Sequence, residues 1–390
     1  MPLRKYTEIL PIILNTILTL SVLYAPQPLL PVLSQEFGIS REAAAALTTV
    51  TFIPLALAPL AYGYLLETIS PIRVLKITVP LLAVSELCFA GTSSFPLLMT
   101  IRLIQGLLVP AILTSLMTYL SERSSADTVQ RVMAIYIAAT IFGGFIGRAT
   151  SGLIANQFGW RFSFLLLAVT LCIGFLTLFH LPETSGLKTV RPQPKVLLEV
   201  LRRPAFLPIY LSIFCLFLIF AAVMNFLPFR LTELSDQANE LRIGLMYTGY
   251  MMGIVTSLGA PKIVSWVNGE LKTIRVGLFC LGLTLIGLAT NQIWLLFGMM
   301  FLFCGAMFLV HSTASGLVNQ LAGSQYRGMT NGLYVAFYYA GGSIGSFAPG
   351  IIYRHFGWNG FLILLALVCC TGYICINRVR LPIKPQDKAC

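Results

Sequence analysis

Charged residues are scarce in this chain of 390 residues. Asp, Glu, Lys and Arg make up 10% of it and hydrophobic residues 57%, whereas a soluble domain is about one quarter charged. With a mean hydropathy of +0.84, such a chain does not stay dissolved, which excludes a soluble enzyme and a soluble binding module. Its solvent is therefore lipid, where the backbone finds no water and only helices or closed barrels can span.

Motifs for ATP hydrolysis and metal chemistry are also absent from the sequence. There is no G-x-x-x-x-G-K-[ST] phosphate loop, no H-E-x-x-H and no C-x-x-C pattern, so we expect no ATP-driven step and no bound metal or cofactor. Eight of the nine cysteines lie in apolar stretches, which is typical of buried thiols and not of a disulfide framework.

Long apolar runs are what the sequence has instead. Each run is about twenty residues long, the length of a spanning helix, and lacks the alternation of a barrel strand. We expect twelve spans, at 9–31, 43–65, 74–92, 95–120, 131–153, 160–181, 206–229, 243–261, 273–290, 292–320, 328–352 and 358–377.

A repeat divides these spans into two halves. The segment 143–147 (GGFIG) returns 198 residues later as 341–345 (GGSIG), and FGW at 158–160 returns at 356–358. Six spans in each half give both halves the same orientation in the membrane, which is a parallel repeat. We therefore expect an all-α membrane protein whose twelve transmembrane helices form two six-helix bundles related by pseudo-two-fold symmetry.

Lys and Arg are distributed unevenly between the two membrane faces. If the N-terminus is cytoplasmic, 19 of the 26 lie on the cytoplasmic side, 5 on the other side and 2 inside the membrane. This bias predicts that both termini are cytoplasmic. Anionic lipid headgroups then explain the net charge of +12, and no nucleic-acid partner is expected.

Composition also predicts the domain boundaries. Residues 1–181 are the expected N-terminal six-helix bundle, and residues 206–377 are the C-terminal one. Between them, residues 182–205 are polar, cationic and interrupted by proline, which favours a flexible cytoplasmic linker. Residues 378–390 are the expected cytoplasmic tail.

The fourth span carries a motif that points to one family. Arg102-x-x-Gln105-Gly106 resembles the Arg-x-x-Gln-Gly motif of helix 4 in the major facilitator superfamily. The segment 24–31 (YAPQPLLP) resembles a bacterial subgroup of efflux permeases within it. Twelve spans, a repeat of six and a basic central linker fit the same family over the whole chain.

Two further motifs resemble that family, with departures. Gly63-Tyr-Leu-Leu-Glu67 followed by Arg73 is similar to its loop motif between helices 2 and 3, where Asp is usual in place of Glu67. The glycines at 143 and 147 resemble the helix-5 motif of its antiporters, which usually has Pro where this chain has Arg148.

The resemblance implies a secondary transporter in the inner membrane of a bacterium. Two bundles would rock about a site near the midplane and expose it to each side in turn, with a proton gradient as the energy source. We expect efflux of a small organic compound in exchange for protons, by a monomer without enzymatic activity. The same residues would also serve a proton symporter or a uniporter that takes up a small organic metabolite, including an anionic one.

Buried charges are the first candidates for the substrate and proton pathway. Arg102 lies about two turns into its span, where a cation is costly unless it meets water or a partner, and Gln105 is placed to orient it. Glu86 is the only acid inside a predicted span; a carboxyl removed from water can bind and release protons near neutral pH. Alternatively, Arg102 is structural and Glu86 is paired with it or with Arg148.

Arg148 stands out because the repeat has Ser346 at the matching position. A buried charge that breaks the symmetry favours a role in substrate binding or coupling, and two buried arginines with one glutamate suit an anionic group. The surrounding glycines, spaced four apart, favour close helix packing.

The remaining polar candidates are uncharged or titratable near neutrality. His311 lies in the middle of the tenth span and could carry a proton or serve as a hydrogen-bonded structural residue. Asn15, Gln27 and Asn225 lie on the first and seventh spans, which line the cavity in the resembled family. Each of them could bind substrate or simply tie helices together.

The expected gate lies on the cytoplasmic side. Gly63, Glu67 and Arg73 belong to the loop after the second span, and Arg131 and Arg327 precede the fifth and eleventh spans. A charge pair there, next to a helix N-terminus, can hold one side shut and release it. The alternative is an ordinary solvated loop, in which such pairs contribute little.

One enzymatic alternative rests on Gly341-x-Ser343-x-Gly345, which matches the nucleophile pattern of hydrolases, with His311 as a base. The matching position in the first half is Phe145, so the glycines serve packing. The pattern also lacks the strand–turn–helix context of a nucleophile elbow. We therefore reject an intramembrane hydrolase.

Overall fold

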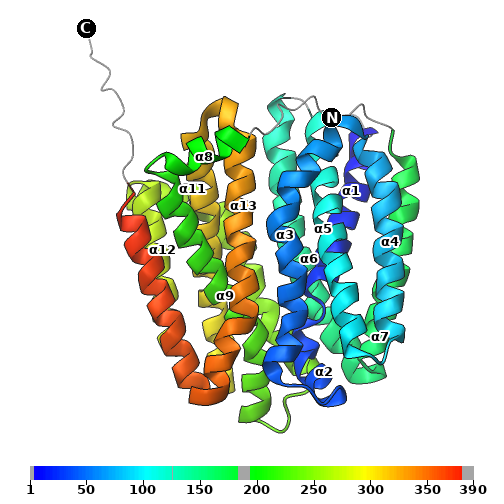
Figure 1. The fold of residues 1–390 in the computed structure, drawn as a ribbon, viewed down its shortest axis with the longest axis vertical. Coiled ribbons are helices and arrows are strands. Elements are labelled where there is room, and N and C mark those ends of the chain that lie inside the picture. The colour runs from blue at the N-terminus through cyan, green and yellow to red at the C-terminus, as the bar shows by residue number, and fades with distance from the viewer. Residues whose placement is uncertain (1–3, 125, 183–193, 380–390) are drawn as a thin grey trace.

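The computed structural model of the chain describes residues 4–124, 126–182 and 194–379. The side chains of 4–7, 59–61, 63–68, 126–131, 194–197 and 323–328 lie outside this description. All regular structure in the described residues is helical, and most helices run side by side along the long axis of the molecule (Figure 1).

The helices fall into two groups along the chain. The first half holds α1 (Arg4–Tyr24), η1 (Gln27–Leu29), α2 (Leu30–Glu36), α3 (Arg41–Thr68), α4 (Pro71–Gly91), α5 (Phe95–Arg123), α6 (Ala126–Phe158), α7 (Trp160–Thr177) and η2 (Leu178–His180). The second half holds α9 (Phe206–Leu234), α10 (Glu240–Met246), η3 (Tyr247–Met251), α11 (Met252–Val267), α12 (Glu270–Gly287) and α13 (Ile293–Asn377), preceded by α8 (Pro194–Arg202).

The long element α13 is folded back on itself. Over 85 residues a straight helix would be about 130 Å long at 1.5 Å per residue. Yet the Tyr334 hydroxyl contacts His311 Nδ1 at 2.9 Å, and Gly357 adopts a left-handed conformation with φ +67°. The expected spans 292–320, 328–352 and 358–377 lie within α13 apart from residue 292, its N-cap, and these contacts fit the turns expected between them.

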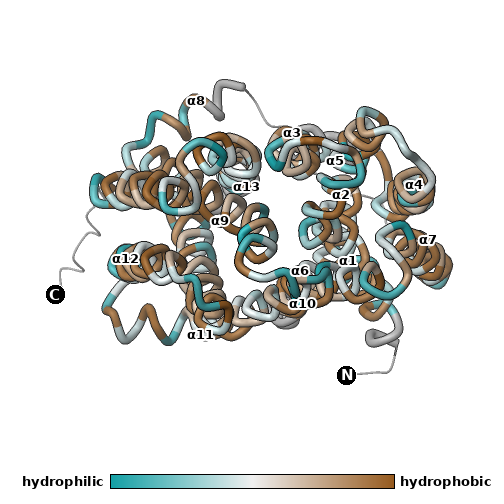
Figure 2. Tube along the Cα trace, turned by 90° about the horizontal axis from the view of Figure 1, so that it is seen from below, coloured by the Kyte–Doolittle hydropathy of each residue, from teal (hydrophilic) through white to brown (hydrophobic). Residues whose placement is uncertain are grey.

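The two halves meet along two seams. Figure 2, seen along the helices from the end that carries α2, has α3 beside α13 and α6 beside α10. A Cβ on Gly152 of α6 would meet the backbone of Glu240, and one on Gly350 of α13 would lie 3.0 Å from Glu42 Cγ. Both glycines and both glutamates are 198 residues apart, so the seams follow the sequence repeat.

The repeated glycines allow helices to touch within each half. A Cβ on Gly143 would lie 2.6 Å from the Ile17 carbonyl of α1, and a Cβ on Gly341 would meet the Phe214 carbonyl of α9. The expectation that these glycines serve close packing is confirmed. Equivalent helices of the two halves therefore pack in the same way, as a parallel repeat requires.

The expected linker contains regular structure. Residues 194–202 form α8, whose Val200 is fully buried and which packs against α9 and α13. Apolar residues cluster on one face of this short segment, so it gains more from packing than from remaining extended. Residues 183–193 lie outside the description.

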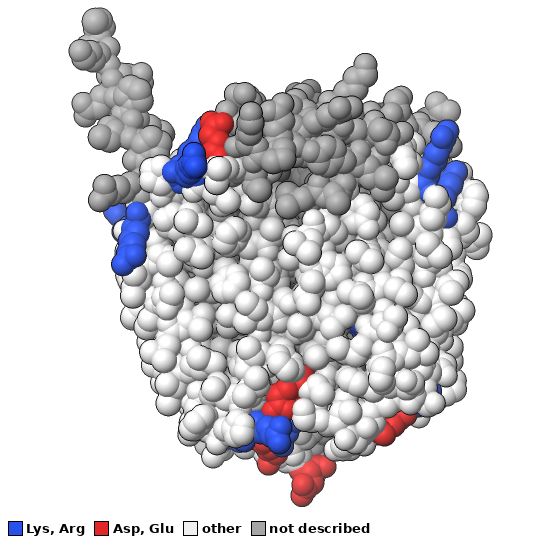
Figure 3. Space-filling view, viewed as in Figure 1, with Lys and Arg blue, Asp and Glu red and all other residues white. Residues whose placement is uncertain are grey.

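The surface suits a lipid environment. In the view of Figure 3, charged side chains gather at the two ends of the molecule and leave the middle nearly free of charge. In the described part of the chain, ten helical segments are long and apolar enough to cross a membrane. The protein is therefore a multi-pass membrane protein.

The glycine packing predicts a sharp position dependence for substitution. Gly345→Val should destabilise the fold because a Cβ there would lie 2.8 Å from Leu218 Cα, and overpacking costs about 1–3 kcal/mol. Gly298→Val is the matched control, since nothing lies within 4 Å of its Cβ position. Thermal unfolding in detergent should show a lower Tm for the first variant only; equal effects would contradict the close contact.

Candidate functional site

The first span contains a break in its helix. The expected span 9–31 lies within the candidate membrane span Glu8–Glu36, but α1 ends at Tyr24, and a short 3-10 turn follows over η1. In a continuous helix Val22 O would accept a hydrogen bond from residue 26, but residue 26 is proline and has no N–H. Leu23 O would accept from residue 27, but Gln27 belongs to the 3-10 turn. Val22 O and Leu23 O both need other donors.

Arg102 supplies those donors. From α5 its Nη1 donates to Val22 O at 3.2 Å, its Nη2 donates to Leu23 O at 2.8 Å, and its Nε reaches Leu47 O of α3 at 3.4 Å. The side chain is 1% exposed. Its cost of burial is thus offset by carbonyl dipoles at a helix C-terminus, which favour a cation.

Gln105 connects this arginine to the buried acid. Its Oε1 accepts from Arg102 Nη1 at 2.7 Å, and its Nε2 donates to Glu86 Oε1 at 2.6 Å and to Ser85 Oγ at 3.1 Å. Glu86 is fully buried on α4, and its Oε2 has no hydrogen-bond partner among the described residues. The expected grouping of Arg102, Gln105 and Glu86 is present, with the amide between the two charges.

Arg148 lies in a different setting on α6. Its Nε donates to Gln27 Oε1 at 2.6 Å and its Nη1 to Gly144 O at 2.6 Å. Three tyrosine rings surround the guanidinium, with centroids 4.1 Å (Tyr24), 4.6 Å (Tyr250) and 5.2 Å (Tyr247) from its carbon. The side chain is fully buried.

A polar bridge joins the two halves next to Arg148. Gln27 Nε2 donates to Asn225 Oδ1 at 2.7 Å, and Thr48 Oγ1 reaches the same oxygen at 3.3 Å. Gln27 and Asn225 are 198 residues apart. The α1 and α9 residues that contact the repeated glycines, such as Ser21 and Leu218, are 197 apart, so Gln27 and Asn225 are within one residue of equivalent positions. Such nearly equivalent positions can touch only near the axis that relates the halves.

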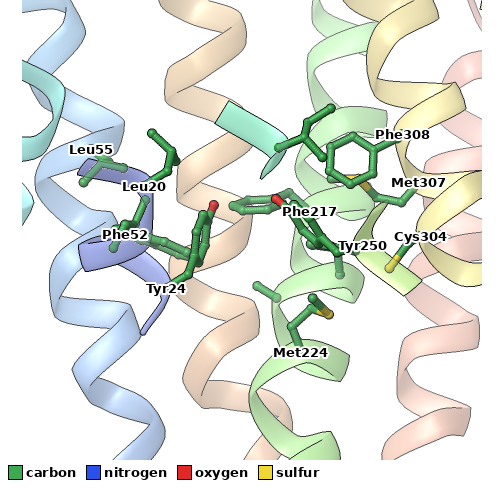
Figure 4. Close-up of a cluster of buried hydrophobic side chains, with 14 of the residues drawn as sticks. Leu20, Tyr24, Phe52, Leu55, Phe217, Met224, Tyr250, Cys304, Met307 and Phe308 are labelled. Atoms are coloured by element: carbon green, nitrogen blue, oxygen red, sulfur yellow. The ribbon is translucent and has the colours of Figure 1, made fainter. Parts of the chain in front are cut away.

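Aromatic rings surround this centre. Figure 4 shows Tyr24 and Phe52 on first-half helices facing Phe217, Tyr250 and Phe308 on second-half helices. Tyr24 and Tyr250 have ring centroids 6.5 Å apart, and Phe52 and Phe217 5.5 Å apart. In α9, Pro228 has no N–H to donate to Met224 O, and the Tyr247 hydroxyl donates to that carbonyl instead, at 2.7 Å.

A charged cluster closes the α2 end, and sequence reasoning missed it. Arg41 of α3 pairs with Glu233 of α9, which also accepts from Tyr353 at 2.7 Å and from Arg230 at 3.3 Å. An open cleft of about 680 Å³ is lined by these side chains together with Glu42. No sequence signal marks this pairing, because it depends on the helix packing between the halves.

Two predicted residues are not part of the network of Arg148, Gln27 and Asn225. Asn15 Nδ2 donates to Pro11 O at 2.8 Å and Gly174 O at 3.1 Å, tying α1 to α7. His311 contacts Tyr334 and lies 4.8 Å from the Tyr338 ring, between segments of α13. Both sets of contacts are those of residues that tie helices together.

The expected gate is mostly outside the description. The side chains of Gly63, Glu67, Arg131 and Arg327 are not among those described. Arg73 is exposed in the first turn of α4. Their gating role stays a prediction.

A family model identifies the chain. The model of the Major Facilitator Superfamily matches residues 12–268 and 237–389. The chain belongs to the major facilitator superfamily.

Relatives within the superfamily cover nearly the whole chain. The inner membrane transport protein YnfM of Escherichia coli is 28% identical, over 93% of this chain and 88% of its own. An uncharacterized MFS-type transporter of Bacillus subtilis, YybF, is 26% identical over 95% and 93%. The 4-hydroxybenzoate transporter PcaK of Pseudomonas aeruginosa is 28% identical over 41% of this chain and 36% of its own.

A solved structure of the superfamily has the same fold. A bacterial homologue of the human lysosomal transporter Spinster superposes with a TM-score of 0.80 at 12% identity, over 97% of this chain and 98% of that one. This likeness shows the fold, and the family model with the relatives shows that the chain is a membrane transporter of this superfamily.

The repair of the α1 break predicts coupling between two residues. Arg102→Gln should lower the Tm because it leaves Val22 O and Leu23 O without donors, and Pro26→Ala should soften that loss by restoring an N–H at position 26. We expect a coupling of about 1 kcal/mol in a double-mutant cycle of thermal unfolding in detergent. Strictly additive effects would mean that Arg102 does not serve the break.

Proposed function

We propose that the protein is a secondary active transporter that exchanges a small organic compound for protons by rocking two bundles about the Gln27–Asn225 pair. The polar bridge at this pair is the observation that carries the proposal. It is buried and joins nearly equivalent positions of the repeat. A polar centre between two apolar halves is where a parallel-repeat transporter binds its substrate.

The proposed architecture is twelve spans in two bundles of six. Ten segments meet the criteria of length and apolarity. One of them, Met329–Asn377, contains the left-handed turn at Gly357 and is long enough for two spans. The twelfth is α12, whose 18 residues include the charges of Glu270, Lys272 and Arg275 at its start.

The proposed membrane is the inner membrane of a bacterium, with both termini in the cytoplasm. The excess of Lys and Arg at the end that holds the N-terminus supports this orientation. A relative from Escherichia coli is named an inner membrane protein. The α2 end then faces outward, and the working unit is a monomer in contact with lipid.

Closure of the outward side supports the rocking motion. The pair Arg41–Glu233 joins the halves there, and Thr49 Oγ1 donates to Ser343 O at 3.0 Å further in. Opening to the outside must break these contacts, whereas the central pair Gln27–Asn225 is close to the pivot. The cytoplasmic gate of Glu67, Arg73, Arg131 and Arg327 would then act in the opposite phase.

Glu86 is the proposed proton carrier. It is buried away from the substrate centre, and its free Oε2 can hold a proton without losing the bond to Gln105. Protonation of Glu86 would affect Arg102, which binds the carbonyls at the C-terminal end of α1, beside Tyr24 and Gln27. Efflux by antiport is our preferred direction; a symporter or uniporter for uptake would use the same residues, and measured flux direction separates them.

Proteoliposomes loaded with a pH dye test proton coupling. Wild-type protein should change luminal pH when a transported organic compound is added, and Glu86→Gln should abolish that change while retaining compound flux or binding. Ser85→Ala is the matched control, because it removes the other acceptor of Gln105 and leaves the carboxyl. Unchanged proton flux in Glu86→Gln would retire Glu86 as the carrier.

Hydrogen–deuterium exchange tests closure at the α2 end. Glu233→Gln should speed exchange in the first turn of α3 and around residue 353, because the pairing with Arg41 is weakened. Glu36→Gln is the control, since Glu36 pairs with Arg161 at the same end but within one half. If both variants behave alike, the cluster does not hold the halves together.

A further inference from the structure

We infer that Arg148, Gln27 and Asn225 form the binding site for the carboxylate of an organic anion, whose apolar body lies among the surrounding aromatic rings. This inference rests on the proposed function and names the substrate class of the same centre. Four observations carry it: an unbalanced charge, two vacant donors, the placement of both donors on one bridge, and the walls around them.

The first observation is the balance of buried charge. Among the described residues, the buried charged side chains are Glu42, Glu86, Arg102 and Arg148. Arg102 and Glu86 share Gln105, and Glu42 lines the cleft at the α2 end. Arg148 has no acidic partner in the described part of the chain, and a buried cation without a counter-charge favours binding of an anion.

The second observation concerns hydrogen-bond donors. Arg148 Nη2 and Asn225 Nδ2 are both buried and have no hydrogen-bond partner in the described part of the chain. The Tyr250 hydroxyl interacts with the guanidinium, but Nη2 itself has no acceptor among the described residues. Buried donors are normally satisfied, so two vacant donors indicate that an acceptor is missing.

The third observation is that one residue links both vacant donors. Gln27 accepts from Arg148 Nε through Oε1 and donates to Asn225 Oδ1 through Nε2. The free nitrogens of Arg148 and Asn225 are thus held on either side of a single amide. A carboxylate, with two oxygens and no donor, suits two such groups better than an alcohol or an ammonium.

The fourth observation is the apolar wall. Tyr24, Phe52, Phe220 and Tyr250 form a continuous set of ring contacts, with Phe220 and Tyr250 centroids 5.9 Å apart. Gly144 lets the Tyr250 ring and the guanidinium approach α6 closely, since a Cβ there would lie 3.1 Å from the Tyr250 ring and 3.3 Å from Arg148 Nη1. Such walls favour an apolar or flat organic body over a bare inorganic ion.

Arg102 shows what a structural arginine looks like in the same protein. Each of its three nitrogens has an oxygen acceptor, on two helices and on Gln105. Arg148 has the same burial but leaves one nitrogen vacant. The difference between the two is the basis for assigning the ligand to Arg148.

The test is binding to the purified full-length protein in detergent, measured by thermal shift and isothermal titration. The probes are benzoate and hexanoate, their neutral amides benzamide and hexanamide, and sodium chloride. We expect at least one carboxylate to raise the Tm and its amide not to, because a bound ligand stabilises by mass action. This comparison uses the wild-type chain, so it does not depend on a variant that folds.

Variants then assign the site. Arg148→Gln should weaken binding of the carboxylate at least tenfold, Arg148→Lys should restore part of it, and Asn225→Asp should weaken it by repulsion. Arg161→Gln is the control. Arg161 also stacks on an aromatic ring, with its Cζ 4.3 Å from the Trp160 centroid, but it lies at the α2 end, where it pairs with Glu36. It should bind the carboxylate like wild type.

The possible results are separable. Amides that bind as well as the acids, stabilisation by chloride alone, no binding of either acid, or an Arg148→Gln variant with wild-type affinity would each overturn the inference. If the protein still drives proton flux with a neutral or cationic compound, the proposed function stands and the inference fails. If carboxylates bind at Arg148 but no compound evokes flux in either direction, the inference stands and the proposed function fails.

Discussion

The interruption of α1 at Pro26 is the constraint on which the centre of this protein depends. A break in the lipid-embedded part of a helix exposes carbonyls to a medium without water. Arg102 satisfies Val22 O and Leu23 O, and Ser151 of α6 donates to Ala25 O at 2.8 Å. The break is therefore stable only because two neighbouring helices supply donors. It also places Gln27 where it contacts Asn225 of the other half.

The two buried arginines stand on opposite sides of this break, which offers a physical route for coupling. Glu86 reaches Arg102 only through the amide of Gln105. A protonated Glu86 would donate to the Gln105 amide oxygen and compete there with Arg102 Nη1, which also donates to Val22 O. The contact of Arg102 with α1 would change, and the next residues along the chain carry the contacts to Arg148. The proposed proton and substrate sites are thus connected through backbone, without direct contact.

Much of this could be predicted from sequence, and the misses have identifiable causes. Apolar runs predict membrane-spanning helices because a helix satisfies the backbone hydrogen bonds in lipid. The spacing of the glycines at 143 and 341 predicts the repeated helix packing. The pairing of Gln27 with Asn225 was within reach, since both lie at the repeat spacing. The break at Pro26 was missed because hydropathy does not register a lost N–H. The pair Arg41–Glu233 joins non-equivalent positions, so neither the repeat nor charge counting could reveal it.

The contacts between the halves differ in role according to their place relative to the axis of the repeat. A pair on the pseudo-two-fold axis near the pivot keeps its distance when the halves rock, so Gln27–Asn225 can persist through the proposed cycle. A pair at the rim, such as Arg41–Glu233, must separate by the full opening and therefore has to be weak enough to break, as exposed ion pairs are. Arg148 has no counterpart in the second half, so an anion bound there moves with the first bundle. Opening and closing of the second bundle then changes the access of water to the anion without changing its principal charge contact.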